Sequence, residues 1–247
     1  MMPEKIRRVV SEGTGCVVMA AVGALTLLCA GGCASGNYQK ADAASESLRR
    51  ASIQIDAENH AIDLALARLD SLVNKPAPDL KPQFKQFSEA LDHLVAASDR
   101  AEKAAADAHH KSNEYFRNWD KEVAAINFEA VKEQSVSRKT QVSNEFNTVD
   151  QRYRENQAVV IPLISYLRDI RTALSTDLTP GGLESVKPLA ENAGQNARKV
   201  QGALDRLTSD LSASRTQFSS VVLRGPEPEG GVMDVTQTNQ ERAQSQP

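Results

Sequence analysis

The sequence predicts an all-α protein: a long, antiparallel, coiled-coil-like bundle of about four helices in up-down-up-down order. Aromatic residues make up only 4% of the 247 residues, whereas apolar residues make up 40%, and a sheet would favour more aromatic and β-branched side chains. Apolar residues recur at alternating steps of three and four along four segments, the spacing that places them on one face of a helix. Short breaks containing Gly and Pro separate most of these segments, and such breaks are typical of turns.

Residues 1–32 predict a signal peptide. Three basic residues lie among the first eight, and an uncharged apolar stretch follows over residues 16–30. This stretch is shorter than the roughly 20 apolar residues of a transmembrane helix. Small residues then lead to Cys33, an order that resembles the lipobox of bacterial lipoproteins. We therefore expect lipidation of Cys33 and a tether over residues 33–36; the alternative is a secreted protein in which Cys33 is incidental.

The resemblance to a lipobox also implies a location in the cell. The residue after Cys33 is Ala34 and not aspartate, so the inner-membrane retention signal of enterobacterial lipoproteins is absent. The resemblance then implies sorting to the outer membrane, with the body of the protein facing the periplasm. The first expected partner is therefore a membrane, to which the N-terminal lipid attaches the protein.

Composition narrows the classes of protein to which the chain can belong. All three cysteines, Cys16, Cys29 and Cys33, lie in the first 33 residues. A chain cleaved before Cys33 can form no intramolecular disulfide and no cysteine-cluster metal site. The formal net charge is −3, and no strongly basic stripe marks a nucleic-acid surface. The body must therefore be held together by apolar packing.

Residues 37–223 are expected to form this helical body. In the first segment, which ends at a Pro-rich break over residues 75–82, large apolar residues recur every seven positions: Leu48, Ile55, Ile62 and Leu69. The second segment has the clearest pattern, which runs from Phe84 to Ile126 with small residues in its middle. Small side chains in an apolar row indicate that another helix approaches closely there.

Prolines raise two questions about the last two segments. Pro162 lies inside the third pattern, and we expect it to kink the helix there rather than end it. A break at residues 179–182 precedes the fourth pattern, and Pro188 lies in the early part of that pattern. The fourth helix is expected to begin near Gly182 with a bend, or near Lys187.

The join between the second and third segments has two interpretations. Residues 127–141 contain no Gly or Pro, and the apolar pattern slips there by one residue, which fits a tight turn or a stutter in a continuous helix. The four runs are each about 38–46 residues, or roughly 57–69 Å long, and equal lengths favour four helices with a turn near residues 127–135. The alternative is three helices with a continuous long central one. The polar residues 224–247 are expected to be a disordered tail.

Several residues in the second half of the body resemble a known family. They are Tyr115-Phe116, Trp119, Glu122, Ile126-Asn127, Ser135, Arg138, Tyr153, Pro162-Leu163 and Asp177-Leu178-Thr179. Together they resemble DUF2959, a bacterial envelope family of unknown function, over most of residues 37–222. The resemblance implies a helical, lipid-anchored envelope protein and implies no known activity.

Candidate sites for chemistry are few. His60 and Asp56 are four residues apart and offer at best a weak site for a divalent ion, whereas the adjacent His109 and His110 point about 100° apart on a helix,. A solvated helix face explains these residues, so we expect no metal site. Glu122 lies in an apolar row, where it is either a buried acid or a residue that turns to solvent. No Gly-rich phosphate loop, nucleophile elbow or Cys–His arrangement is present in the chain after residue 32,.

Tyr115, Phe116 and Trp119 form an aromatic cluster near one end of the expected bundle. Packing in the core is the simpler interpretation, and contact with a partner is the other. Phe116 lies one residue off the apolar row, so it is the best candidate for an exposed contact.

The leading hypothesis is a non-enzymatic envelope lipoprotein that acts as a structural or protein-interaction rod in the periplasm. Long patterned helices, the lipid on Cys33 and a tail that reaches a partner all fit this hypothesis, and self-association through the helices would also fit. The alternative is a holdase-like chaperone or lipid-binding bundle that opens at the Ala- and Ser-rich middle of the second segment. We expect no enzymatic activity and no cofactor, because no group of residues converges on a catalytic site.

Overall fold

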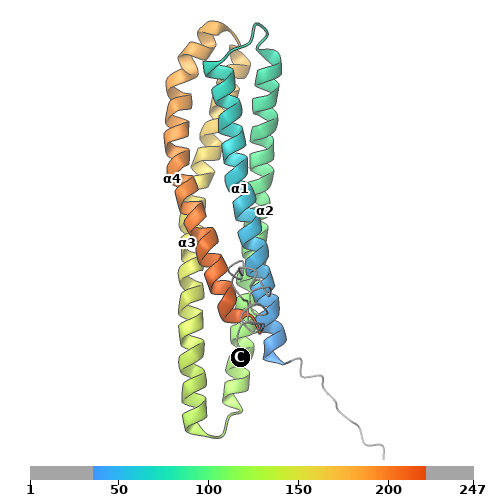
Figure 1. The fold of residues 1–247 in the computed structure, drawn as a ribbon, viewed down its shortest axis with the longest axis vertical. Helices are drawn as coiled ribbons and strands as arrows, with labels where there is room; N and C mark the ends of the chain where they lie inside the picture. Colours follow the sequence, from blue (N-terminus) through green and yellow to red (C-terminus); the bar gives the residue numbers. More distant parts are fainter. Residues whose placement is uncertain (1–35, 221–247) are drawn as a thin grey trace, which may run out of the picture. The chain divides into compact units, whose positions relative to one another are not determined.

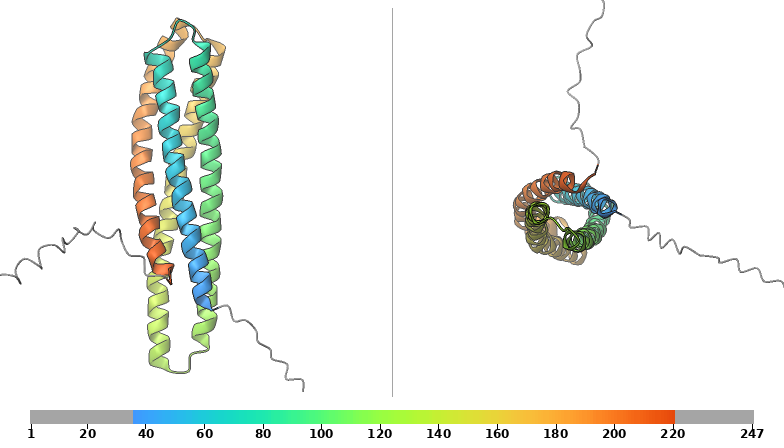
Figure 2. Two further views of the ribbon diagram at one scale, coloured as in Figure 1. Left: turned by 45° about the vertical axis from the view of Figure 1, so that its right-hand side comes forward. Right: turned by 90° about the horizontal axis from the view of Figure 1, so that it is seen from below.

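Four helices make up nearly all of the computed structural model, which describes residues 36–220. They are α1 (Asn37–Asn74), α2 (Lys81–Ala124), α3 (Glu129–Thr176) and α4 (Pro180–Phe218), and these described residues contain no strand. The helices run up, down, up and down (Figure 1). α1 packs against α2 and α4, and α3 packs against the same two helices, so the four form a closed ring, seen end-on in Figure 2. The predicted all-α bundle is confirmed.

The second and third segments are separate helices. α2 ends at Ala124 and α3 begins at Glu129, so the alternative of a continuous central helix is not favoured. The turn lies at the early edge of the range expected from the sequence. Phe128 precedes α3 with an extended backbone, and Glu129 places a negative charge in the first turn, where the helix dipole stabilises it.

The prolines are accommodated in different ways. α3 continues through Pro162, as expected, although the proline lacks the N–H that would bond the carbonyl of Ala158. α4 begins at Pro180 and Pro188 lies inside it, so the start agrees with the alternative near Gly182 and not with the one near Lys187. Thr179 explains this start, because its hydroxyl caps the helix by accepting a hydrogen bond from the Gly182 N–H at 3.2 Å,, and proline is favoured in the first turn. The signal peptide and the tail expected over 224–247 lie outside the described residues.

The apolar rows of the four helices meet in one core. Its largest fully buried side chains include leucines and isoleucines from α1, α2 and α3. Small residues are also buried along the middle of α2, among them Ala97, Ala101 and Ala108, in line with the close packing expected from the sequence. In residues 36–220 no helix is long and apolar enough to cross a membrane.

The hairpin formed by α2 and α3 is longer than the neighbouring helices α1 and α4. The Asn118 side chain donates a hydrogen bond to the Asn37 side chain at 3.1 Å, so α1 starts level with Asn118. Arg138 donates to Gln217 at 2.6 Å, one residue before α4 ends. Residues 119–137 therefore extend past the ends of α1 and α4, as Figures 1 and 2 show. We call this projection the hairpin tip.

Two glycines of α4 make a matched test of the packing at its start. A Cβ on Gly182 would lie 2.1 Å from the backbone oxygen of Asp177, whereas a Cβ on Gly194 would meet nothing within 4 Å. We expect Gly182→Ala to lower the free energy of unfolding by about 1–3 kcal/mol, because backbone must move. Gly194→Ala should raise it by about 0.5–1 kcal/mol, because alanine favours a helix interior. Urea unfolding of both variants measures the difference, and equal effects would contradict the close approach at Gly182.

Candidate functional site

A group of polar side chains interrupts the core midway along the bundle. Glu58 on α1 is 0% exposed and lies between Ile55 and Ile62 of the apolar row. Ser98 of α2 and Gln157 of α3 lie close enough to influence the ionisation of Glu58. Tyr153 of α3 lies close enough for the charge of Glu58 to act on its hydroxyl. We call Glu58, Ser98, Tyr153 and Gln157 the polar layer.

The polar layer is short of hydrogen bonds. Neither carboxylate oxygen of Glu58 makes a hydrogen bond of normal geometry, and the Tyr153 hydroxyl and the Gln157 Nε2 also lack a partner. Buried polar groups are nearly always paired in folded proteins, and each one left unpaired costs about 1–3 kcal/mol. The layer therefore weakens the core at the level where it lies.

The ionisation of the layer follows from burial. Burial raises the pKa of the Glu58 carboxyl above its ordinary value, and the side chains of Ser98 and Gln157 only partly oppose this effect. Burial also raises the pKa of the Tyr153 hydroxyl, and the negative charges of Glu58 and Glu102 add to it. Both shifts favour the neutral forms of these groups. A neutral carboxyl is a hydrogen-bond donor as well as an acceptor, so protonated Glu58 can bond to groups that the carboxylate cannot.

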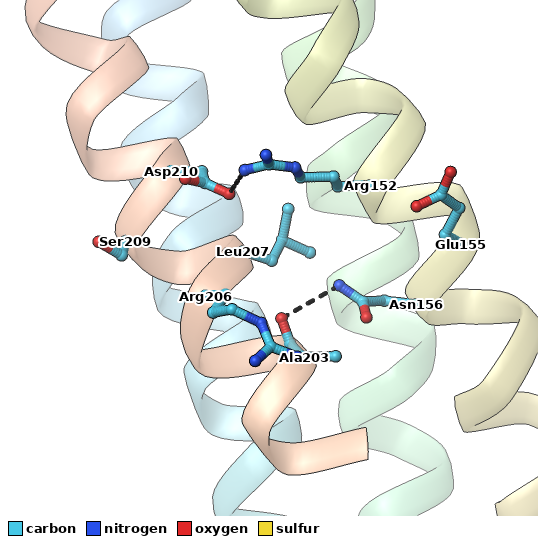
Figure 3. Close-up of a pocket in the computed structure, with 8 residues that line it drawn as sticks. All are labelled: Arg152, Glu155, Asn156, Ala203, Arg206, Leu207, Ser209 and Asp210. Carbon is cyan, nitrogen blue, oxygen red and sulfur yellow. Dashed lines mark hydrogen bonds and ion pairs between the residues drawn. The ribbon is translucent and has the colours of Figure 1, made fainter. Parts of the chain in front are cut away.

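A groove runs along the outside of the bundle between α3 and α4. One part, of roughly 380 Å³, is polar and is shown in Figure 3. Arg152 of α3 pairs with Asp210 of α4 across it, and Asn156 donates a hydrogen bond to the carbonyl oxygen of Ala203 at 3.3 Å. These contacts link the two helices at the level of the polar layer, since Arg152 and Asn156 directly precede Tyr153 and Gln157 in α3.

The adjoining part of the groove is apolar and larger. It has a volume of roughly 590 Å³ and shares Asn156 and Ala203 with the polar part. Val159, Pro162 and Tyr166 of α3 line it, and Val159 is 46% exposed. The sequence analysis missed this groove. A signal was available, because Val159 and Ile161 are apolar residues outside the buried row of α3 and lie beside Pro162.

Metal-binding residues do not converge within residues 36–220, where no group of three His, Cys, Asp or Glu side chains could hold an ion. The Nδ1 of His60 lies 3.7 Å from the Asp56 carboxylate, and both side chains are exposed. The Nδ1 of His109 lies 3.1 Å from the carboxylate of Asp150. Both are contacts between one imidazole and one carboxylate at or near the surface, and contacts of this kind stabilise a fold only slightly.

The described helices coincide with a known family. The model of the family described as "Protein of unknown function (DUF2959)" matches residues 36–221. The chain belongs to the DUF2959 family. This confirms the resemblance found in the sequence, and the match spans all four helices. No curated protein and no solved structure matches the chain.

The aromatic residues of this DUF2959 protein lie mainly inside it. Phe116 is only 8% exposed, so the expected exposure of this side chain is wrong. Its ring lies 5.9 Å from that of Phe146 on α3 and 5.7 Å from that of Phe218 on α4. The physical reason is that α2 packs against two neighbours, so its buried face is wider than one row. Tyr115 is equally buried.

Trp119 is the half-buried member of the aromatic cluster. Its ring lies 5.2 Å from that of Tyr115, and its Nε1 donates a hydrogen bond to the Ser135 hydroxyl at 2.8 Å. Contact of Tyr115, Phe116 and Trp119 with a partner stays a prediction, and Trp119 has the most accessible ring of the three.

Glu122 is exposed, so it is the residue that turns to solvent and not a buried acid. The reason is that it lies in the hairpin tip, beyond the ends of α1 and α4.

The polar layer should make stability depend on pH. The folded protein binds the Glu58 proton more tightly than the unfolded chain, because burial raises the pKa of Glu58 above 4.5. The free energy of unfolding should therefore fall by up to about 1.4 kcal/mol per pH unit from about pH 4.5 up to the folded pKa, and level off above it. Glu58→Met should remove this fall and stabilise the bundle at pH 7 by about 1–3 kcal/mol.

Denaturant unfolding at pH 4 and pH 7 measures the effect. Glu191→Met on the exposed face of α4 is the matched control and should leave the pH dependence as in the wild type. A gain from Glu58→Met that is equal at the two pH values would show that its carboxyl does not titrate differently on folding.

Proposed function

We propose that this DUF2959 protein is a lipid-anchored protein of the bacterial cell envelope, which acts as a rod for protein interaction and not as an enzyme. The observation that carries the proposal is the start of α1 at Asn37, with only residues 34–36 between it and Cys33. A lipid on Cys33 would thus be joined almost directly to a helix of 38 residues. Such an arrangement holds a helical body next to a membrane, because only three residues separate the lipid from the helix.

The distribution of buried and exposed groups supports interaction over catalysis. The charged residue that is buried in the described bundle, Glu58, has no exposed surface, so a substrate cannot reach it in this conformation. Five of the nine exposed large apolar side chains of the described residues lie instead on the hairpin tip and along α3, for example Phe128 at 79% and Ile161 at 60%, and the other four lie on α1 and α4. Exposed apolar side chains that gather at defined places mark surfaces that bind partners.

A second candidate function is the uptake of lipid or unfolded protein. The apolar part of the α3–α4 groove, lined by Val159, Pro162 and Tyr166, favours it, because ligand sites are concave and mostly apolar. The seam expected for such a function in the middle of α2 is closed, since Ala97 and Ala101 are fully buried there. The α3–α4 groove is thus the better place for an apolar ligand.

The anchor is tested by the intact mass of protein extracted from membranes. We expect the wild-type mass to equal that of the chain from Cys33 onward plus acyl groups. Cys33→Ser should lose the acyl groups and leave the membrane fraction, because serine lacks the thiol that is acylated. A wild-type protein that is soluble and has no acyl groups would contradict the proposed anchor.

Binding of a hydrophobic dye separates the two candidate functions. For an interaction rod we expect weak dye fluorescence that is equal in wild type, Val159→Lys and Ile161→Lys. Val159 lines the groove and Ile161 is exposed nearby, so the second variant controls for the added charge. Strong fluorescence that only Val159→Lys abolishes would favour the lipid-binding or holdase function instead.

A further inference from the structure

We propose that the hairpin tip is a second membrane contact, whose apex rests in the surface of the same bilayer that holds the acylated Cys33. The inference rests on the proposed lipid anchor and adds to it a defined orientation of the bundle. Its basis is the coincidence of two features at one end of the bundle: the start of α1 and the projecting apex of the α2–α3 hairpin (Figure 1).

The apex of the hairpin exposes apolar side chains. Phe128 has 79% of its surface exposed, more than the other large apolar residues of the described chain, and Val131 and Val136 are 57% and 46% exposed. Phe128 precedes the first turn of α3 and therefore lies at the turn itself. An aromatic ring followed by apolar residues on a helix suits shallow insertion into the boundary between lipid headgroups and acyl chains.

The reach of the tether matches the overhang of the tip. Four residues of chain join Cys33 to Asn37 and span at most roughly 13–14 Å when fully extended. Asn37 lies level with Asn118 of α2. The overhang is measured along both helices of the hairpin. α2 extends roughly 9 Å from Asn118 to its last residue, Ala124, and α3 extends roughly 14 Å from its first residue to Arg138. With the bundle upright, a bilayer that holds Cys33 therefore lies within reach of Phe128.

Charge at the tip favours an apolar contact over an electrostatic one. Residues 120–133 contain two lysines, Lys121 and Lys132, and four carboxylates, so the tip is not attracted to anionic lipid by net charge. Binding through Phe128 and Val131 would then proceed on neutral lipids and be little affected by salt. A small patch is enough, because the anchor turns its binding into an intramolecular event with a high effective concentration.

The test uses an environment-sensitive fluorophore on the full mature protein, extracted from membranes and reconstituted in phosphatidylcholine vesicles. The fluorophore is placed on Asn127→Cys, an exposed residue beside Phe128, and in a control on Ala77→Cys in the loop between α1 and α2, at the opposite end of the bundle. We expect a blue shift and quenching by brominated lipid at residue 127 and neither at residue 77. Phe128→Ser combined with Val131→Ser should abolish most of the shift and quenching at residue 127.

Each outcome distinguishes the tip from the anchor. The mass of the same sample reports acylation of Cys33, and an unacylated protein would overturn both the anchor and the tip contact. An acylated protein whose residue 127 stays in water would overturn the tip contact alone and leave the anchor standing. A blue shift at residue 127 without quenching by brominated lipid, which grows with protein concentration, would show that the tip binds a second copy of the chain and would also overturn the proposal.

Discussion

The structure depends on one constraint: an apolar row on a single long helix can be buried only by other helices. No disulfide is available to residues 36–220, because the cysteines all precede them. The four rows must therefore close on one another, and the ring of α1, α2, α3 and α4 is the arrangement that closes them. The turns between the helices are short, so each helix lies antiparallel to the one before it.

The polar layer departs from this constraint and weakens the core where it lies. Glu58 is buried without a good hydrogen-bond partner, while both neighbouring apolar residues of its row, Ile55 and Ile62, are fully buried. A polar group in an apolar row penalises helix pairs that slip along each other, because a slipped register would bury it against apolar side chains. The layer can thus favour one register of the four helices at a cost in stability. The α3–α4 groove opens beside the same level, at Asn156 and Ala203, where these two helices are joined by polar contacts.

The sequence predicted features that follow from the pattern along one helix. The four helices, the passage of α3 through Pro162 and the close packing around Ala101 are of this kind, because each depends on local spacing and composition. Core packing of the aromatic cluster was the simpler prediction, but the choice of Phe116 as its best exposed candidate was wrong, since the burial of Phe116 depends on how far α2 turns between its two neighbours. The groove at Val159 and the burial of Glu58 were missed for the same reason: they depend on the rotation of one helix relative to the next.

An even number of antiparallel helices returns the chain to the end at which it began. The backbone N–H and the hydroxyl of Ser220 both bond to the carboxylate of Asp42, at 2.9 and 2.8 Å, so α4 ends beside the first turns of α1. Residue 220 consequently lies at the end of the bundle from which α1 starts. The loop between α1 and α2 lies at the opposite end (Figure 1), so a tag inserted there would stand as far as the bundle allows from both the start of α1 and the end of α4.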